Sequence, residues 1–63
     1  MYDRVKVISA TMAKDRAVLG ERATEYLRAQ LKKGRRLVDT VVTQSSDHAF
    51  HCVAITMFFK DPS

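Results

Sequence analysis

The densest charge in the sequence is a run of four cations interrupted by one glycine, Lys32-Lys33-Gly34-Arg35-Arg36. Arginine presents a planar fork of N–H donors that matches a phosphate group, so Arg35 and Arg36 are candidates to hold one phosphate between them. A second interpretation needs no ligand, because cations near the end of a helix are favoured by its dipole. The run contains no aromatic residue, which disfavours a stacking platform for single-stranded nucleic acid.

Two more cations alternate near the N-terminus, in the segment MYDRVKVISA. Arg4 and Lys6 either guard an edge strand against aggregation, or point to the sheet face that the helix leaves uncovered. There Asp39 would pair with one of them across an interface and the other would meet an anionic ligand. Tyr2 or Phe50 would then offer an aromatic surface for a base. The candidate ligand-binding residues are Tyr2, Arg4, Lys6, Arg35, Arg36 and Phe50.

No group of residues predicts a reaction. His48 and His51 are candidates for an acid, a base or a ligand, because imidazole as a group titrates near neutrality, but no carboxylate is identified to orient either ring. Cys52 lies in an apolar run and is predicted to be a small buried hydrophobe, since a reactive thiol needs an electropositive, accessible setting. The sequence contains no phosphate-binding loop, dinucleotide fingerprint or zinc-protease helix, and its histidines and cysteine match no structural zinc spacing. We therefore expect a protein that is not an enzyme and has no metal or cofactor.

Composition sets the size of the protein and its setting. The chain has 63 residues, with 11 Lys and Arg against 7 Asp and Glu, and this excess favours anionic partners. We expect a single domain over residues 1–63, at a size where folding buries only about 60% of the chain's surface and oligomerisation often adds stability. The single cysteine excludes a disulfide within the chain. No apolar segment is long enough to span a bilayer and no signal peptide is visible, so we expect a cytoplasmic protein without membrane contact.

The first half of the chain predicts a strand followed by a helix. Residues 2–10 alternate, with valines on one face and Arg4, Lys6 and Ile8 on the other. Thr11 or Asp15 is expected to cap a helix that continues to about residue 33, where Gly34 fits the left-handed residue that ends a helix. Gly20 within it is expected to mark a close approach to the sheet. The apolar stripe of this helix is Leu19, Ala23, Tyr26, Leu27 and Leu31.

The second half predicts a hairpin, with strands at residues 37–45 and 49–60 and a tight turn around Ser46-Asp47. A two-residue turn would place Thr43 opposite Phe50, Val41 opposite Cys52 and Val38 opposite Ile55. The helix is expected to cover a face that carries Val38, Val42, Val53, Ile55 and Met57. The opposite face is expected to carry Leu37, Asp39, Val41, Thr43, Phe50, Cys52, Ala54, Thr56 and Phe58.

These elements predict an α+β domain of β-α-β-β order, with the first strand central or beside the last. One helix covers one face of a small, mostly antiparallel sheet. The other face is too apolar for a solvated surface, and such a patch usually marks a protein contact. We therefore expect a second copy of the chain to cover it, as a homodimer or larger oligomer.

The pattern of short elements resembles that of a family of very small sporulation proteins that also occurs in phages. The resemblance is carried by Val5-Lys6-Val7, the leucine-spaced amphipathic helix, Leu37-Val38-Asp39 and the closing run from Phe50 to Phe58. That family has an acidic character, whereas this chain is basic. The layout is also similar to that of phage proteins that act as sponges, which sequester a nucleotide immune signal as homo-oligomers. A further resemblance is to dodecins, the flavin-storing β-α-β-β oligomers, but this chain has no Trp to stack on a flavin.

Three hypotheses follow for the function. The first is a homo-oligomeric binding protein that holds a small anionic ligand, a nucleotide or cyclic nucleotide signal, as the phage sponges do. The second is an interaction or assembly module that uses the same apolar face and binds no small molecule. The third is a nucleic-acid-binding protein that works through the basic run, and its binding would fall steeply with salt.

Overall fold

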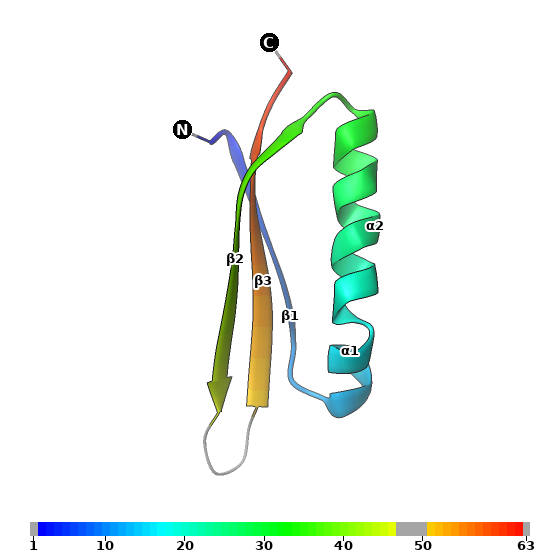
Figure 1. Cartoon of the computed structure of the whole chain (residues 1–63), viewed down its shortest axis with the longest axis vertical. Coiled ribbons are helices and arrows are strands. Elements are labelled where there is room, and N and C mark those ends of the chain that lie inside the picture. The colour runs from blue at the N-terminus through cyan, green and yellow to red at the C-terminus, as the bar shows by residue number, and fades with distance from the viewer. Residues whose placement is uncertain (1, 47–50, 63) are drawn as a thin grey trace.

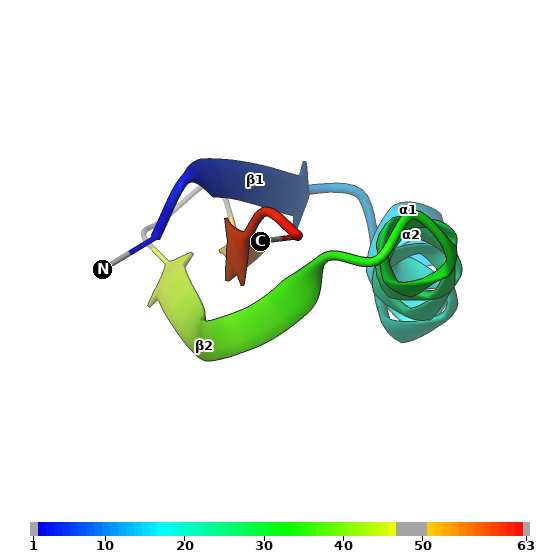
Figure 2. The same cartoon turned by 90° about the horizontal axis from the view of Figure 1, so that it is seen from above.

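The structure, a computed structural model, describes residues 2–46 and 51–62. Three strands form one sheet in which β3 lies between β1 and β2, and both helices lie on the same side of it (Figures 1 and 2). The α+β class and the β-α-β-β order are therefore confirmed, with β1 beside the last strand. The elements are β1 (Arg4–Ala10), α1 (Ala13–Ala17), α2 (Leu19–Lys32), β2 (Arg36–Ser46) and β3 (His51–Lys60).

Both outer strands pair antiparallel with β3, so β1 and β2 run parallel to each other at the two edges of the sheet. The helical segment carries the chain from one edge to the other across a single face. In the described part of the chain no segment covers the opposite face, which we call the open face. None of the described helices is long and apolar enough to cross a membrane.

The helical segment begins and breaks differently from the sequence prediction. Two helices replace the single predicted one, because the backbone leaves helical geometry at Val18. The residue that precedes α1 is Met12, whose extended backbone carries no side-chain cap, so the predicted caps at Thr11 and Asp15 are wrong. The carbonyl of Thr11 instead accepts a hydrogen bond from Nη1 of Arg16, which ties the start of α1 to the strand before it.

Gly34 ends α2 as predicted. Its φ of 86° lies in the left-handed region that other residues avoid. The N–H of Gly34 donates to the carbonyl of Leu31 at 3.0 Å, and the N–H of Arg35 donates to the carbonyl of Gln30 at 3.2 Å. These two bonds form a Schellman motif, which satisfies carbonyls at the helix end and turns the chain into β2.

The core lies between α2 and the covered face of the sheet. Its largest fully buried side chain is Phe59, which is 1% exposed. Leu19 and Ala23 of the predicted stripe are buried, but Gln30 is 6% exposed where Leu31 was expected, and Leu31 is 50% exposed. The buried cluster consists of Ile8, Ala10, Leu19, Ala23, Met57 and Phe59, with Tyr26, Leu27, Val53 and Ile55 packed against it. The predicted close approach at Gly20 is wrong, because a Cβ added there would meet nothing within 4 Å.

The hairpin register differs from the prediction. The described ladder between β2 and β3 continues to Ser46 opposite His51, so the predicted turn is wrong at Ser46, while residues 47–50 lie outside the described residues. Thr43 lies opposite Ala54 and Val41 opposite Thr56, four residues further along β3 than predicted. An even shift keeps each side chain on its face, because side chains alternate along a strand. The open face therefore still carries Val41, Thr43, Ala54, Thr56 and Phe58, joined by Val5 and Val7 of β1.

A bulge between Leu37 and Asp39 exchanges the predicted faces at the start of β2. Leu37 pairs with the core residue Phe59 on the helix side. Val38 lies in the bulge and lines a pocket on the open face together with Tyr2. Ile55 lies opposite Val42, so the predicted pairing of Val38 with Ile55 is wrong. The extra residue in the bulged strand reverses the alternation at this point, and the sequence contains no glycine or proline that would indicate it.

Candidate anion-binding site

One end of the molecule collects residues that are far apart in the sequence. The start of β1, the end of α2, the start of β2 and the end of β3 all lie there, together with both chain ends (Figure 1). Four of the predicted ligand-binding residues belong to this end: Tyr2, Arg4, Arg35 and Arg36. The fold thus brings together two cation groups that the sequence separates by about half its length.

Two of these arginines share one carboxylate. Oδ1 of Asp61 accepts a hydrogen bond from Nε of Arg4 at 2.7 Å and another from Nε of Arg35 at 3.2 Å. The hydrogen bond from Arg4, and with it the bond and charge of Arg35, hold the pKa of Asp61 below its ordinary value. The alternative that Arg4 and Lys6 share a sheet face with Asp39 is wrong, because both cations pair with residues of the helix side and Asp39 lies on the open face opposite Phe58.

Arg35 is fixed by a second bond. Its Nη1 donates to Oε1 of the buried Gln30 at 2.5 Å, and its side chain is only 18% exposed. The same tail is held from the other side, since the backbone N–H of Asp61 donates to Oδ2 of Asp3 at 2.9 Å. Arg35 therefore connects the end of α2 to the C-terminal tail, and its guanidinium is occupied by groups of its own chain.

Arg36 has different surroundings from its neighbour. It lies directly opposite Lys60 in the ladder, on the open side of the sheet, and neither cation forms an ion pair with another described residue. Like charges placed opposite each other on neighbouring strands destabilise a sheet. Both residues line a shallow pocket of about 410 Å³ with Gly34, Asp61 and Pro62. An anion bound between them would relieve their repulsion.

An aromatic pair lies beside these cations. The rings of Tyr2 and Phe58 have centroids 4.8 Å apart and are tilted by 59°. Phe58 and Lys60 share one face of β3, because side chains two residues apart point the same way. With Val38 and Asp39 the two rings line a second pocket of about 360 Å³. The end of the open face thus combines two cations with an apolar, aromatic surface.

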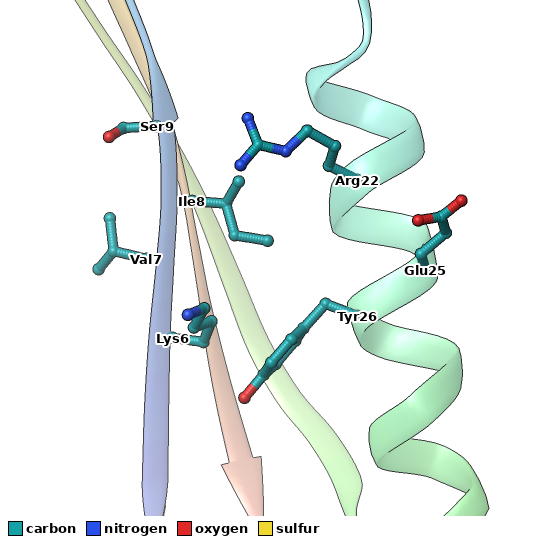
Figure 3. Close-up of a pocket in the computed structure, with 7 residues that line it drawn as sticks. All are labelled: Lys6, Val7, Ile8, Ser9, Arg22, Glu25 and Tyr26. Carbon is teal, nitrogen blue, oxygen red and sulfur yellow. The ribbon is translucent and has the colours of Figure 1, made fainter. Parts of the chain in front are cut away.

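Lys6 lies elsewhere, in a groove between β1 and α2 (Figure 3). Its ammonium group lies 5.4 Å from the centroid of the Tyr26 ring, a cation–π contact. Arg22 reaches from α2 toward β1, whereas Glu25 points away from the groove. The pocket measures about 630 Å³ and is lined by Lys6, Val7, Ile8, Ser9, Arg22, Glu25 and Tyr26. Lys6 therefore lies on the covered face of the sheet, whereas Arg36 and Lys60 lie on the open face.

The sequence prediction missed two residues of this end. Lys60 follows Phe58 by two positions, so alternation alone could have placed both on one face. Asp61 gave no signal, because a single acid near a chain end has no periodic context. Phe50, the remaining predicted residue, lies outside the described residues. Cys52, predicted to be buried, is half-buried and lies opposite Ser45. Within residues 2–46 and 51–62, no group of His, Cys, Asp and Glu side chains is arranged to hold a metal ion.

No family model, curated protein or solved structure matches this chain. The resemblance to sporulation proteins, phage sponges and dodecins therefore stays a prediction. The case for a function rests on the geometry described above.

Proposed function

We propose that this protein is a non-enzymatic homo-oligomer that binds and sequesters a small anionic ligand of the nucleotide or cyclic-nucleotide class. Arg36 and Lys60 would hold the phosphate, and Tyr2 with Phe58 would contact the base. The observation that carries the proposal is the juxtaposition of these two pairs on one face of the sheet. The resemblance to phage sponges makes a nucleotide immune signal the ligand to test first.

The chemistry of the four side chains suits such a ligand. Arg36 offers a planar fork that binds two phosphate oxygens, and Lys60 adds a compact charge with rotatable donors. The tilted rings of Tyr2 and Phe58 present both an edge and a face to a flat base.

The open face supports self-association. A monomer of 7.2 kDa is expected to expose about 4,100 Å², whereas this chain exposes 4755 Å². The excess of roughly 600 Å² means that the single chain leaves more surface exposed than a monomer of its size usually does. Val5, Val7 and Val41 are exposed on the open face, and the candidate site lies at one end of it. A second copy seated there would wall the shallow pockets.

Isothermal titration against mono-, di- and cyclic nucleotides tests the proposal. Arg36→Ala with Lys60→Ala should weaken binding by at least about 100-fold, because hydrogen bonds to charged groups contribute about 1.5–3 kcal/mol each. The control pair Lys32→Ala with Lys33→Ala removes the same charge from the end of α2 and should have a much smaller effect. Equal loss in both variants would indicate diffuse attraction, and no binding by the parent protein would exclude the proposal.

An assembly module without a small ligand is the second candidate, and the apolar open face is the observation that favours it. Native mass spectrometry of protein purified from cells separates the two, because it reports the number of subunits and any retained small molecule together. A defined oligomer that retains no ligand and binds no nucleotide supports the assembly module. Binding to polynucleotides that falls steeply as salt rises would instead support a nucleic-acid-binding protein.

A further inference from the structure

The two edges of the sheet differ in how they are protected. Edge strands present unpaired backbone groups, and natural proteins usually guard them with charges. The β1 edge carries Arg4 and Lys6 and faces Arg22 across the groove. The β2 edge has no charged side chain over residues 40–46, and Val42 there is 64% exposed. The β2 edge is therefore long, carries mainly β-branched side chains and has no charge that would oppose pairing with another strand.

Backbone directions identify which groups of β2 point outward. The carbonyl of Phe59 accepts a hydrogen bond from the N–H of Asp3, so Phe59 is turned toward β1. Directions alternate along a strand, and Phe58, Thr56 and Ala54 are therefore turned toward β2. Their partners Asp39, Val41 and Thr43 form the hydrogen-bonded pairs with β3. The backbone groups at Thr40, Val42 and Gln44 must then point away from the sheet.

A second observation agrees with this assignment. The N–H of Thr40 donates to Oδ1 of Asp39 at 2.8 Å, a bond made outside the ladder. This side chain occupies the outward donor at one end of the edge. Val42 and Gln44 keep their outward N–H and C=O groups without a partner among the described residues.

We propose that β2 pairs antiparallel with β2 of a second copy, about a two-fold axis that passes through Thr43. In this register Val42 exchanges two backbone hydrogen bonds with Gln44 of the second copy, and the symmetry repeats the pair. Thr43 of the two copies lie side by side on the open face as a non-hydrogen-bonded pair. A second copy fits because residues 40–46 are self-complementary: this shared segment contains no charged residue, so no like charges meet within it, and Asp39 lies just beyond it.

This contact uses a surface other than the open face and does not depend on the proposed ligand. It joins two sheets edge to edge, with the two-fold axis perpendicular to the sheet. Both helices then lie on the same side, and the two open faces become one continuous apolar surface. Val42, the most exposed large apolar side chain among residues 2–46 and 51–62, gains a cross-strand neighbour.

Cysteine crosslinking tests the register. All variants carry Cys52→Ser, because Cys52 lies opposite Ser45 and would otherwise capture a new thiol within the chain. Thr43→Cys should form a disulfide-linked dimer on mild oxidation, since non-hydrogen-bonded partners have Cα atoms about 4.5 Å apart, within disulfide range. Val41→Cys and Ser45→Cys should each fail alone, because the symmetry-related copies of either position lie about 13 Å apart along the strand.

The matched positive control is a mixture. Val41 faces Ser45 of the second copy in this register, so Val41→Cys mixed with Ser45→Cys should crosslink as efficiently as Thr43→Cys alone. Absence of crosslinking at Thr43 in folded protein, or equal crosslinking of Val41→Cys alone, would overturn the proposal. A sheet-on-sheet contact through the open face has no reason to give this pattern of one self-pair and one mixed pair.

A guarding charge supplies an independent measurement. Val42→Lys should shift the protein to a smaller assembly in light scattering at micromolar concentration, because it places two lysines beside the shared strands. The monomer fold should tolerate it, since Val42 is exposed and outside the core. A variant that folds and keeps the parent's assembly size would contradict the edge pairing.

Discussion

Two adjacent phenylalanines show how differently the two faces of the sheet are used. Phe59 points into the core beneath α2 and is 1% exposed, whereas Phe58 points to the open face and contacts Tyr2. The chain supplies one helical layer, so only one of its two apolar faces is covered from within (Figure 2). Apolar character alone therefore does not decide which residues are buried in a protein of this size. Packing of the covered face against α2 stabilises the single chain, whereas apolar side chains of the open face stay exposed in it.

The same contrast appears in the cations at the end of the sheet. Arg4 and Arg35 lie toward the helix side and share the carboxylate of Asp61. Arg36 and Lys60 lie on the open side with no acidic partner among residues 2–46 and 51–62. Neighbours in the sequence thus have different roles, one in fixing the tail and one available to an anion.

A substitution in the covered face of the sheet should lower the stability of the protein most. Phe59→Ala removes the centre of the core and should lower the free energy of unfolding by about 3–5 kcal/mol. A small domain has a total stability near the lower end of about 5–15 kcal/mol, so the variant should be largely unfolded. Urea denaturation followed by circular dichroism measures this. Phe58→Ala is the matched control and should cost far less, and equal costs would show that the two faces are not distinct.

A substitution in the open face should change the assembly state of the protein. Val7→Glu places a charge in the proposed subunit contact and should dissociate the oligomer, because burial of an unpaired charge costs several kcal/mol. Val7 lies on β1, far from the β2 edge, so it reports on the face alone. Light scattering over a range of concentrations measures the assembly. Ala29→Glu, on the exposed side of α2, is the control, and an unchanged assembly in Val7→Glu would exclude the face as a contact.

Periodicity predicted both faces of the sheet but not the details that depend on contacts. The alternation of β1, most of the helix stripe and the stop at Gly34 could all be read from the sequence, because each follows from local backbone geometry. The register was wrong, because pairing along the whole length of β2 and β3 sets it, whereas the sequence offered only a local turn signal at Ser46 and Asp47. The buried position of Gln30 was missed, because its amide needs Arg35 as a partner and that partner follows the helix end.

The candidate site was predicted in part for the same reason. The sequence marked Arg35 and Arg36 as an equivalent pair, because adjacent residues of one type look alike in a pattern. The turn after α2 directs Arg35 inward toward Gln30 and Asp61, while Arg36 enters the strand on the open side. Tyr2 and Lys60 reach this end of the sheet through contacts between segments that are far apart in the sequence. Such contacts leave no local sequence pattern.

Arg35 and Arg36 should also differ in how much each contributes to the free energy of unfolding. Arg35→Ala leaves the amide oxygen of buried Gln30 without its donor and should lower the free energy of unfolding by about 1–3 kcal/mol. Arg36→Ala removes an exposed side chain and should change it by no more than about 0.5 kcal/mol in either direction. Thermal and urea unfolding of both variants measure the difference. Equal stability of the two variants would show that Arg35 is not a structural residue.

The smallest effect tests the shared carboxylate by its pH dependence. The pKa of Asp61 is lower in the folded protein than its ordinary value of 3.8, because Arg4 and then Arg35 stabilise the ionised form. An acid with a depressed folded pKa contributes stability above the unfolded pKa and loses that contribution as pH falls through the folded value. Asp61→Asn should therefore lower the melting temperature slightly at pH 7, and the difference from the parent should shrink progressively below pH 3.8.

Arg4 provides the internal control for this measurement. The hydrogen bond from Arg4 is the largest cause of the lowered pKa, so in an Arg4→Gln background the Asp61→Asn difference should lose much of its pH dependence. Arg35 would then be the remaining cation bound to the Asp61 carboxylate, while Asp3 still accepts the hydrogen bond from the backbone N–H of Asp61. A melting-temperature difference that stays constant between pH 7 and pH 3 would show that the carboxylate acts as a neutral acceptor. In that case the covered end would be fixed by hydrogen bonds alone, and the charge contrast between Arg35 and Arg36 would disappear.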